Sequence, residues 1–403
     1  MSFDVIAFII FIILLGLVLY LKRDKLDIQK VFFPFIYLIL YRTKLGLRLM
    51  DSWSKKYNYI IKLFGYCSIG FGFVGMIYIS LAIFMFVLKL IFFPSVSEPG
   101  VSLVLPFTNI PGVGYLSFTH WILALFLLAI VHEFAHGVVA RAWKVPVKSS
   151  GFAVLALLAP IIPAAFVEPD EKHMEKRDDV VKYSVFAAGP IANLVFAFLI
   201  LLAFPFVGDV SGSTTAPYED QITEPIGFSF ETLEGDYPAT LANVPNGVIN
   251  GINGNEFDDY TEFYKQMMCV RPDEALTLNT EEGDYLITTG VKEDDPERGF
   301  IGIKPVQNER RVKDEYTSMA PFYYWLKGFF KWLFLLNFFI GLANLLPLGI
   351  VDGGRMLQVA LHKTISNKKK AQKIWVWIGF MFLFALVFAL VVNYFGNPFL
   401  LLR

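Results

Sequence analysis

The sequence is poor in cysteine and in charged residues. Its 403 residues include two cysteines, Cys67 and Cys269, and charged side chains make up only 18% of the chain. Two cysteines so far apart exclude a disulfide framework and a Cys-x-x-Cys motif, so we expect both to be free. The shortage of charge excludes an ordinary soluble composition, because 55% of the residues are hydrophobic and 16% are aromatic.

The chain also lacks an excess of either charge. Its net charge is −1, and we expect no nucleic-acid partner. The charges are unevenly distributed, however. Residues 206–318 contain 23 acidic and 8 basic residues, so the rest of the chain carries a net charge of +14. This asymmetry predicts an acidic soluble domain inserted into a membrane protein with basic loops.

Long apolar runs predict a polytopic α-helical membrane protein with about six transmembrane helices. The runs lie at residues 5–21, 63–93, 118–142, 183–206, 322–346 and 374–395. Lys and Arg follow the first run rather than precede it, which indicates a retained helix and not a cleaved signal peptide. No Lys or Arg occurs in 94–117, whereas both are abundant in 22–62, 144–182 and 353–374. This distribution places the N-terminus and the acidic domain on the extracytoplasmic side.

Two shorter apolar segments do not fit a crossing. Residues 31–41 are too few to span a bilayer and include a proline, which predicts an interfacial or re-entrant piece. Gly151–Val167 is uncharged but contains Pro160 and Pro163. A crossing there would reverse the helices that follow and put Asp352 on the outer face. A re-entrant hairpin keeps six crossings and is the interpretation we favour.

The predicted helix at 118–142 carries the pattern His-Glu-x-x-His at His132, Glu133 and His136. Two imidazoles at positions i and i+4 stack on one helix face and can bind a single zinc ion. Glu133 projects about 100° away round the helix, where it reaches a metal-bound water without being a ligand. The pattern predicts a zinc hydrolase with Glu133 as general base and then general acid. Its position in an apolar span places the reaction within the membrane.

Asp352 is the candidate for the third ligand that a catalytic zinc usually has. It is the only acidic residue between Tyr316 and the end of the sequence. Pro347 ends the helix before it, and the two glycines after it allow close approach of the backbone. On its own, Asp352 is equally compatible with a plain charge at a helix end. With the two histidines at a similar depth, ligation is the stronger interpretation, and the active site lies toward the cytoplasmic side.

Three motifs occur in order on separate membrane segments. They are His132-Glu133-x-x-His136, Gly189-Pro190-Ile191-Ala192-Asn193 and Asn344-x-x-Pro347-x-x-x-x-Asp352-Gly353. Together they resemble the site-2 protease family of intramembrane zinc metalloproteases, over roughly residues 118–395. The resemblance implies that one zinc ion binds to His132, His136 and Asp352, and that Asn193 lies near the active site. The implied substrate is a membrane-spanning protein, already trimmed by another protease and cleaved within the lipid bilayer.

Four further residues are candidate substrate contacts. The segment Gly151–Pro169 resembles the family's membrane-associated β-hairpin, to which an unwound substrate is added as a strand. Gly151 and Phe166 in that hairpin are therefore candidates, together with Asn193 and Asn344. For both asparagines the alternative is a hydrogen bond to a neighbouring helix, and for Asn344 that alternative is favoured.

Residues 222–306 are similar to a PDZ domain of the α+β class. The similarity rests on a short helix and turn at Pro238–Gly247, a strand that ends at Asn253-Gly254, and a second helix at Asp258–Met268. Gly227-Phe228 is the candidate carboxylate-binding edge. Such a domain either receives the new C-terminus of a trimmed substrate or excludes substrates with bulky external domains, and the acidic charge favours the gate. A passive stabilising module is the alternative.

The expected organisation therefore has four parts. They are an N-terminal two-helix region, the first part of a catalytic core, the PDZ-like domain and the second part of the core, at residues 1–117, 118–206, 222–306 and 319–403.

Two other functions remain open at this point. A membrane-anchored zincin that cleaves soluble or prenylated peptides would take its third ligand from a downstream Glu or His, but only His362 follows Asp352. A membrane metal transporter or a non-catalytic zinc-binding scaffold would not need Glu133. Replacing Glu133 by Gln separates these functions, because a protease would lose cleavage while still binding zinc.

Overall fold

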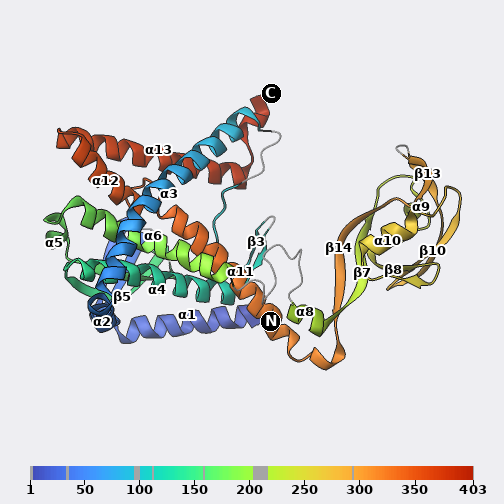
Figure 1. The fold of residues 1–403 in the computed structure, drawn as a ribbon, viewed down its shortest axis with the longest axis horizontal. Coiled ribbons are helices and arrows are strands. Elements are labelled where there is room, and N and C mark those ends of the chain that lie inside the picture. Colours follow the sequence, from blue (N-terminus) through green and yellow to red (C-terminus); the bar gives the residue numbers. More distant parts are fainter. Residues whose placement is uncertain are drawn as a thin grey trace. The chain divides into compact units, whose positions relative to one another are not determined.

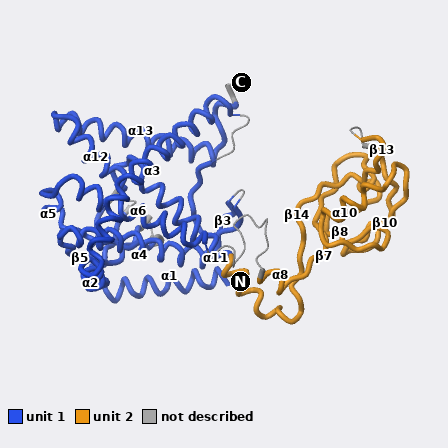
Figure 2. The backbone as a smooth tube through the Cα atoms, viewed as in Figure 1, with its two compact units in different colours: residues 1–204, 328–403 blue, residues 205–327 orange. Residues whose placement is uncertain are grey.

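The computed structural model describes residues 3–32, 36–94, 100–110, 113–157, 159–202, 217–292 and 295–402. Its internal contacts divide the chain into two compact units, which Figure 2 shows in different colours. The first unit comprises residues 1–204 and 328–403, and the second comprises residues 205–327.

Six helices in the described part of the chain are long and apolar enough to cross a membrane (Figure 1). They are α1 Phe3–Leu21, α3 Asn58–Phe92, α4 Phe118–Ala142, α6 Asp179–Leu201, α11 Ala320–Ala343 and α13 Lys368–Phe395. The expected number of spans is thereby confirmed, and the chain is a multi-pass membrane protein. The end of the helix predicted at 183–206 lies outside the described residues.

Shorter elements complete the first unit. The helices are α2 Leu47–Lys56, α5 Glu171–Glu175 and α12 Asp352–Thr364, with 3-10 turns at Arg23–Lys25 and Pro398–Leu402. The strands β3 Thr108–Ile110 and β4 Gly114–Leu116 form a small antiparallel pair.

The first unit also contains a four-stranded antiparallel sheet. Its strands are β1 Leu26–Phe32, β2 Ile36–Thr43, β5 Val147–Leu157 and β6 Ala159–Pro169, in the order β1-β2-β5-β6. The described residues of the short apolar segment at 31–41, which are 31–32 and 36–41, thus belong to two strands. The β5–β6 hairpin occupies the segment for which we predicted a re-entrant hairpin, and its depth in a membrane stays a prediction. Within this sheet β6 has an open edge.

Small residues let the membrane helices approach one another closely. An added Cβ on Gly72 of α3 would lie 3.2 Å from the Cβ of Ala187 in α6. An added Cβ on Gly341 of α11 would lie 3.1 Å from the Cβ of Asn193 in α6. These contacts place α6 between α3 and α11 at van der Waals distance, as is usual for helices packed in membranes.

The N-terminus of the motif helix α4 is capped by α1, which runs alongside it (Figure 1). The carboxylate of Asp4 accepts hydrogen bonds from the backbone N–H groups of Phe118 and Thr119, at 3.1 and 3.2 Å, and from the Thr119 hydroxyl at 3.0 Å. A negative charge at a helix N-terminus also complements the helix dipole. The first apolar helix is therefore attached to the helix that carries His132 and His136.

The second unit is built on an antiparallel sheet in the order β11-β10-β8-β7-β14. The strands are β7 Thr223–Thr232, β8 Gly247–Ile252, β10 Ala275–Thr280, β11 Gly283–Thr288 and β14 Ile303–Val312, with β9 Asn255–Glu256 paired to β8. A second pair is formed by β12 Gly290–Lys292 and β13 Asp295–Phe300. Helical segments are α8 Pro217–Ile222, α9 Pro238–Leu241, α10 Tyr260–Met267 and a 3-10 turn at Asp314–Tyr316.

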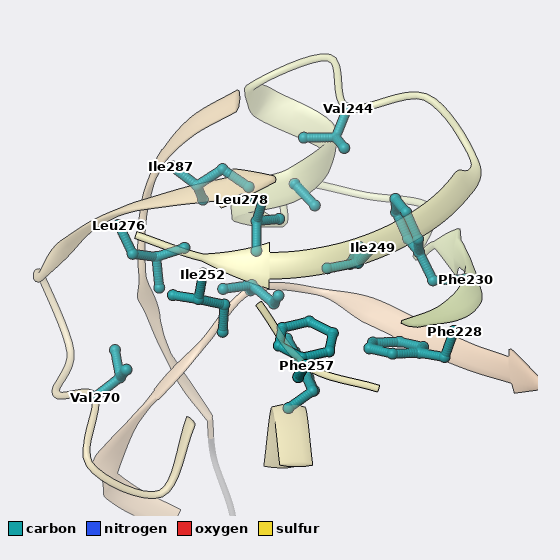
Figure 3. Close-up of a cluster of buried hydrophobic side chains, with 13 residues drawn as sticks. Phe228, Phe230, Val244, Ile249, Ile252, Phe257, Val270, Leu276, Leu278 and Ile287 are labelled. Carbon is teal, nitrogen blue, oxygen red and sulfur yellow. The ribbon is translucent and has the colours of Figure 1, made fainter. Parts of the chain in front are cut away.

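One buried cluster forms the core of this unit (Figure 3). Phe228 and Phe230 of β7 pack there with Ile249, Leu278 and other apolar side chains of the neighbouring strands. The helix predicted at Asp258–Met268 corresponds to α10. The proposed carboxylate-binding edge at Gly227-Phe228 is wrong, because β7 is paired with β8 on one side and β14 on the other, and Phe228 is fully buried. The likeness to a PDZ domain stays a prediction.

Candidate metal centre

Two residues of the candidate metal centre lie on one face of α4. His132 and His136 lie one turn apart, with ring centroids 4.7 Å apart and Nε2 atoms 3.1 Å apart. Both residues are buried, at 8% and 9% exposure. The spacing i, i+4 on a helix therefore has the consequence expected from sequence, because two nitrogen donors converge on one point.

Asp352, the first residue of α12, completes the cluster. Its Oδ2 lies 3.1 Å from Nε2 of His132 and 3.3 Å from Nε2 of His136. The three residues form the one group of metal-ligating side chains found in the described part of the chain. The predicted third ligand is thus where the chemistry requires it, although 216 positions separate it from His136.

The loop between α11 and α12 brings Asp352 to this point. The backbone N–H of Gly353 donates to the carbonyl oxygen of Asn344 at 2.8 Å, which folds the loop back on the end of α11. An added Cβ on Gly353 or Gly354 would overlap the carbonyl oxygens of Leu345 or Leu348. Both positions therefore require glycine, because the backbone of α12 passes against the backbone of the loop.

Helix α6 faces both imidazoles with a stripe of three residues at spacing i, i+4, i+8, Val185, Gly189 and Asn193, of which the first and the last bond to the rings. Nδ1–H of His136 donates to the carbonyl oxygen of Val185 at 2.6 Å, and the side-chain amide of Asn193 lies 3.2 Å from Nδ1 of His132. Asn193 is fully buried, and its Oδ1 is without a partner within the described structure. An amide turned so that Oδ1 accepts from Nδ1–H of His132 satisfies that oxygen. Both Nε2 lone pairs then point at the common centre.

Gly189 is the middle residue of this α6 stripe and faces the centre itself. An added Cβ there would lie 2.7 Å from Nε2 of His132 and still closer to Nε2 of His136. From the sequence, Gly189 was recognised only as part of a motif and was assigned no role. The signal that locates this role is the stripe Val185, Gly189, Asn193, which a helical period aligns on one face.

The donor atoms fit a zinc ion. In a tetrahedral site with bonds of about 2.0–2.1 Å, neighbouring ligand atoms lie about 3.3 Å apart. The separations among the two Nε2 atoms and the Asp352 Oδ2 are 3.1, 3.1 and 3.3 Å. Two imidazoles and one carboxylate are also a ligand set that catalytic zinc accepts, with a fourth position left for water.

Glu133 lies beside the cluster and contacts the sheet. Its Oε2 accepts a hydrogen bond of 2.8 Å from the backbone N–H of Val167 in β6. This N–H group of Val167 points away from the paired strand β5, so the hydrogen bond lies on the open edge of β6. Glu133 is therefore next to both the metal ligands and an unpaired strand edge.

The remaining predicted site residues differ in whether they contact this centre. Gly151 is in β5, which is paired on both sides, and the ring of Phe166 covers it from the neighbouring strand. Phe166 itself precedes Val167 on the edge strand. Asn344 supports the Asp352 loop through its backbone carbonyl. Of the four candidates, the structure brings only Asn193 into contact with a metal ligand, and substrate binding by the others stays a prediction.

Comparison with known proteins places this centre in a family. Residues 120–386, about two thirds of the chain, match the model of Peptidase family M50. The chain is 26% identical over 348 residues to an uncharacterized protein of Methanocaldococcus jannaschii, covering 85% of this chain and 81% of that protein. It is 27% identical over 225 residues to a Nostoc protein named "Putative zinc metalloprotease", covering 47% of this chain and 59% of that protein.

The matched range contains every residue of the buried cluster and the α6 stripe that supports it. Zinc is the metal that the family and the ligand set both indicate. The chain therefore belongs to peptidase family M50, the site-2 protease family of zinc metalloproteases.

Proposed function

We propose that this protein is an intramembrane zinc metalloendopeptidase that hydrolyses a peptide bond within or near a transmembrane helix of a membrane-tethered protein. One observation carries the proposal. The buried cluster of His132, His136 and Asp352 lies on helices of a six-span membrane unit, with Glu133 beside it. Ionisable groups within a membrane are rare and mark functional sites by default, so this position favours a substrate that itself lies in the membrane.

The chemistry follows from the positions of the side chains. A bound zinc ion would lower the pKa of its water toward about 7 and polarise the scissile carbonyl. Glu133 accepts the proton of the attacking water and then donates it to the leaving amine nitrogen. The Val167 N–H holds Oε2 of this carboxylate, so we assign Oε1 to the water. His136 and His132 are kept in the ligating tautomer by Val185 and Asn193.

The open edge of β6 supplies a binding mode for the substrate. A peptide bond in a helix is shielded by its own hydrogen bonds, so the segment to be cut must be extended first. A strand added to β6 replaces the lost hydrogen bonds with backbone bonds to the protein. It would also pass directly in front of Glu133, which is bonded to the same edge. Membrane depth and cytoplasmic orientation of this edge are part of the proposal.

For the second unit we propose a gate that excludes substrates with bulky external domains. A groove of about 240 Å³ lies between α10 and the segment that includes β13 and the start of β14. The cationic residue that lines this groove is Arg298. Its guanidinium is already paired with Asp295 at 3.1 Å and donates to the Tyr264 hydroxyl at 3.3 Å. Because this guanidinium is neutralised, capture of an acidic peptide end is disfavoured. A variant that lacks residues 222–306 should then cleave untrimmed substrates, and unchanged selectivity would refute the gate.

The proposed activity is tested with purified protein in phosphatidylcholine vesicles and a single-span model peptide. Mass spectrometry of the products should locate the cut within the apolar segment, and zinc flux into the vesicles should equal that of empty vesicles. Zinc uptake without peptide cleavage would instead identify a metal transporter. A cut confined to the soluble ends of the peptide would identify a membrane-anchored protease of the ordinary type.

A further inference from the structure

The first unit contains an apolar cavity of about 420 Å³ that the proposed chemistry does not use. Its walls come from α1, α4 and the strands β2, β5 and β6, with short contributions from the segment that joins α1 to β1. Among the described residues that line it, Lys22 is the only one with a charge. The volume falls in the range of ligand pockets and exceeds what one small side chain would fill.

The α4 residues that line the cavity lie on the same helix face as Glu133. Its lining on α4 includes Ile122, Phe126 and Ala129. These residues precede Glu133 by eleven, seven and four positions, so a helical period puts all four on one face. On β6 the lining consists of Pro163, Ala164 and Ala165, so it ends two residues before Val167, the residue bonded to Glu133. The cavity and the carboxylate of Glu133 therefore both lie between α4 and β6.

We propose that this cavity is a specificity pocket that takes a large apolar side chain of the substrate. The inference rests on the proposed function and deepens it. A strand added to β6 places every second side chain on the same face, at steps of about 6.6 Å. A substrate residue a few positions from the scissile bond therefore meets the cavity when the bond itself lies at Glu133. The continuity with the candidate active site is what favours this occupant.

The proposal also assigns a role to α1, which lies outside the range matched by the family model. Leu15 and its neighbours on α1 form one wall of the cavity, and Asp4 fixes the start of α1 to the start of α4. Because lipid tails are as apolar as the pocket, the preference must come from shape and packing rather than from removal of water. We therefore expect discrimination of roughly tenfold between a large and a small side chain.

The test uses full-length protein in phosphatidylcholine vesicles with a set of single-span peptides. The parent peptide has an all-leucine apolar segment with a central Asn-Gly pair, and each further peptide has one leucine near the cut replaced by alanine. Wild-type protein should lose about tenfold in kcat/KM at one position only. Ala129→Phe, which fills the cavity, should reverse the preference at that position. Leu127→Phe, on an exposed part of the same helix, should keep the wild-type pattern.

A second variant distinguishes a change of the pocket from a folding defect. Leu15→Ala widens the cavity from α1 and should shift the preference toward a larger side chain such as tryptophan. Equal effects of Ala129→Phe on every peptide, or wild-type cleavage that no position influences, would overturn the pocket while leaving the protease. Loss of a co-purified phospholipid in Ala129→Phe with an unchanged position pattern would also overturn it, in favour of a lipid site. A wild-type protein that cleaves none of the peptides would overturn the proposed function itself.

Discussion

Gly189→Ala should strongly weaken zinc binding without destabilising helix α6. The new Cβ would lie 2.7 Å from Nε2 of His132, and Cβ atoms in proteins essentially never lie within 3.0 Å of such an atom. His132 must therefore retreat by at least 0.3 Å, and His136 by more. Metal sites tolerate deviations of only about 0.2 Å in the ligand distance. We expect zinc affinity to fall more than about 100-fold, beyond the loss typical of residues that only support a ligand.

The assay is zinc content by atomic spectroscopy after dialysis against a weak chelator, together with thermal stability and peptide cleavage. Alanine is favoured over glycine in a helix by about 1 kcal/mol, so a loss of fold is not expected to obscure the result. Gly16→Ala is the matched control, since an added Cβ at Gly16 of α1 meets nothing within 4 Å. Full zinc content and normal cleavage in Gly189→Ala would refute the assignment of this residue to the metal centre.

Three further predictions follow from contacts near the centre. Asn193→Leu should lower zinc affinity or activity about 10–100-fold because His132 loses its support, and a normal zinc titration would contradict this. Asp4→Ala should destabilise the protein by about 0.5–2 kcal/mol through the lost cap of α4, measured by thermal unfolding in detergent. The Ser149 hydroxyl and then Arg42 lower the pKa of the Glu168 carboxyl. Its stabilisation, under about 1 kcal/mol at this exposure, is present above the usual carboxyl pKa and is lost as the pH falls through the lowered value. Glu168→Gln should remove that part of the acid sensitivity, and an unchanged pH profile would contradict it.

The cluster of candidate metal ligands could be predicted from the sequence because its signals are local or exclusive. His132 and His136 share a helix face by spacing alone, and Asp352 is the only acidic residue in the last part of the chain. Apolar length likewise predicted the six spanning helices, because a bilayer sets a minimum that few other segments reach. α4 begins and ends at the predicted residues, whereas α13 begins at Lys368 instead of residue 374, because the side chain of Asn367 caps it there.

Other features depend on pairings that no local pattern encodes. The segment around residues 36–43 pairs with 150–157, more than a hundred positions away, and its own sequence did not indicate a sheet beside the centre. Gly227-Phe228 was misassigned because a glycine next to an aromatic residue looks the same at an open edge and inside a sheet. Gly189 was recognised as part of a motif, but its role depends on which face of α6 meets α4, and that is a matter of tertiary packing.

The proposed role of Glu133 in a zinc protease is tested by measuring zinc content and peptide cleavage together in Glu133→Gln. Glutamine keeps the shape of the side chain and can still accept the Val167 hydrogen bond, but it cannot take a proton from water. We predict wild-type zinc content, with cleavage of the single-span peptide reduced at least about 100-fold, within the range that general acid–base catalysis contributes. Cleavage at the wild-type rate by Glu133→Gln would contradict the account.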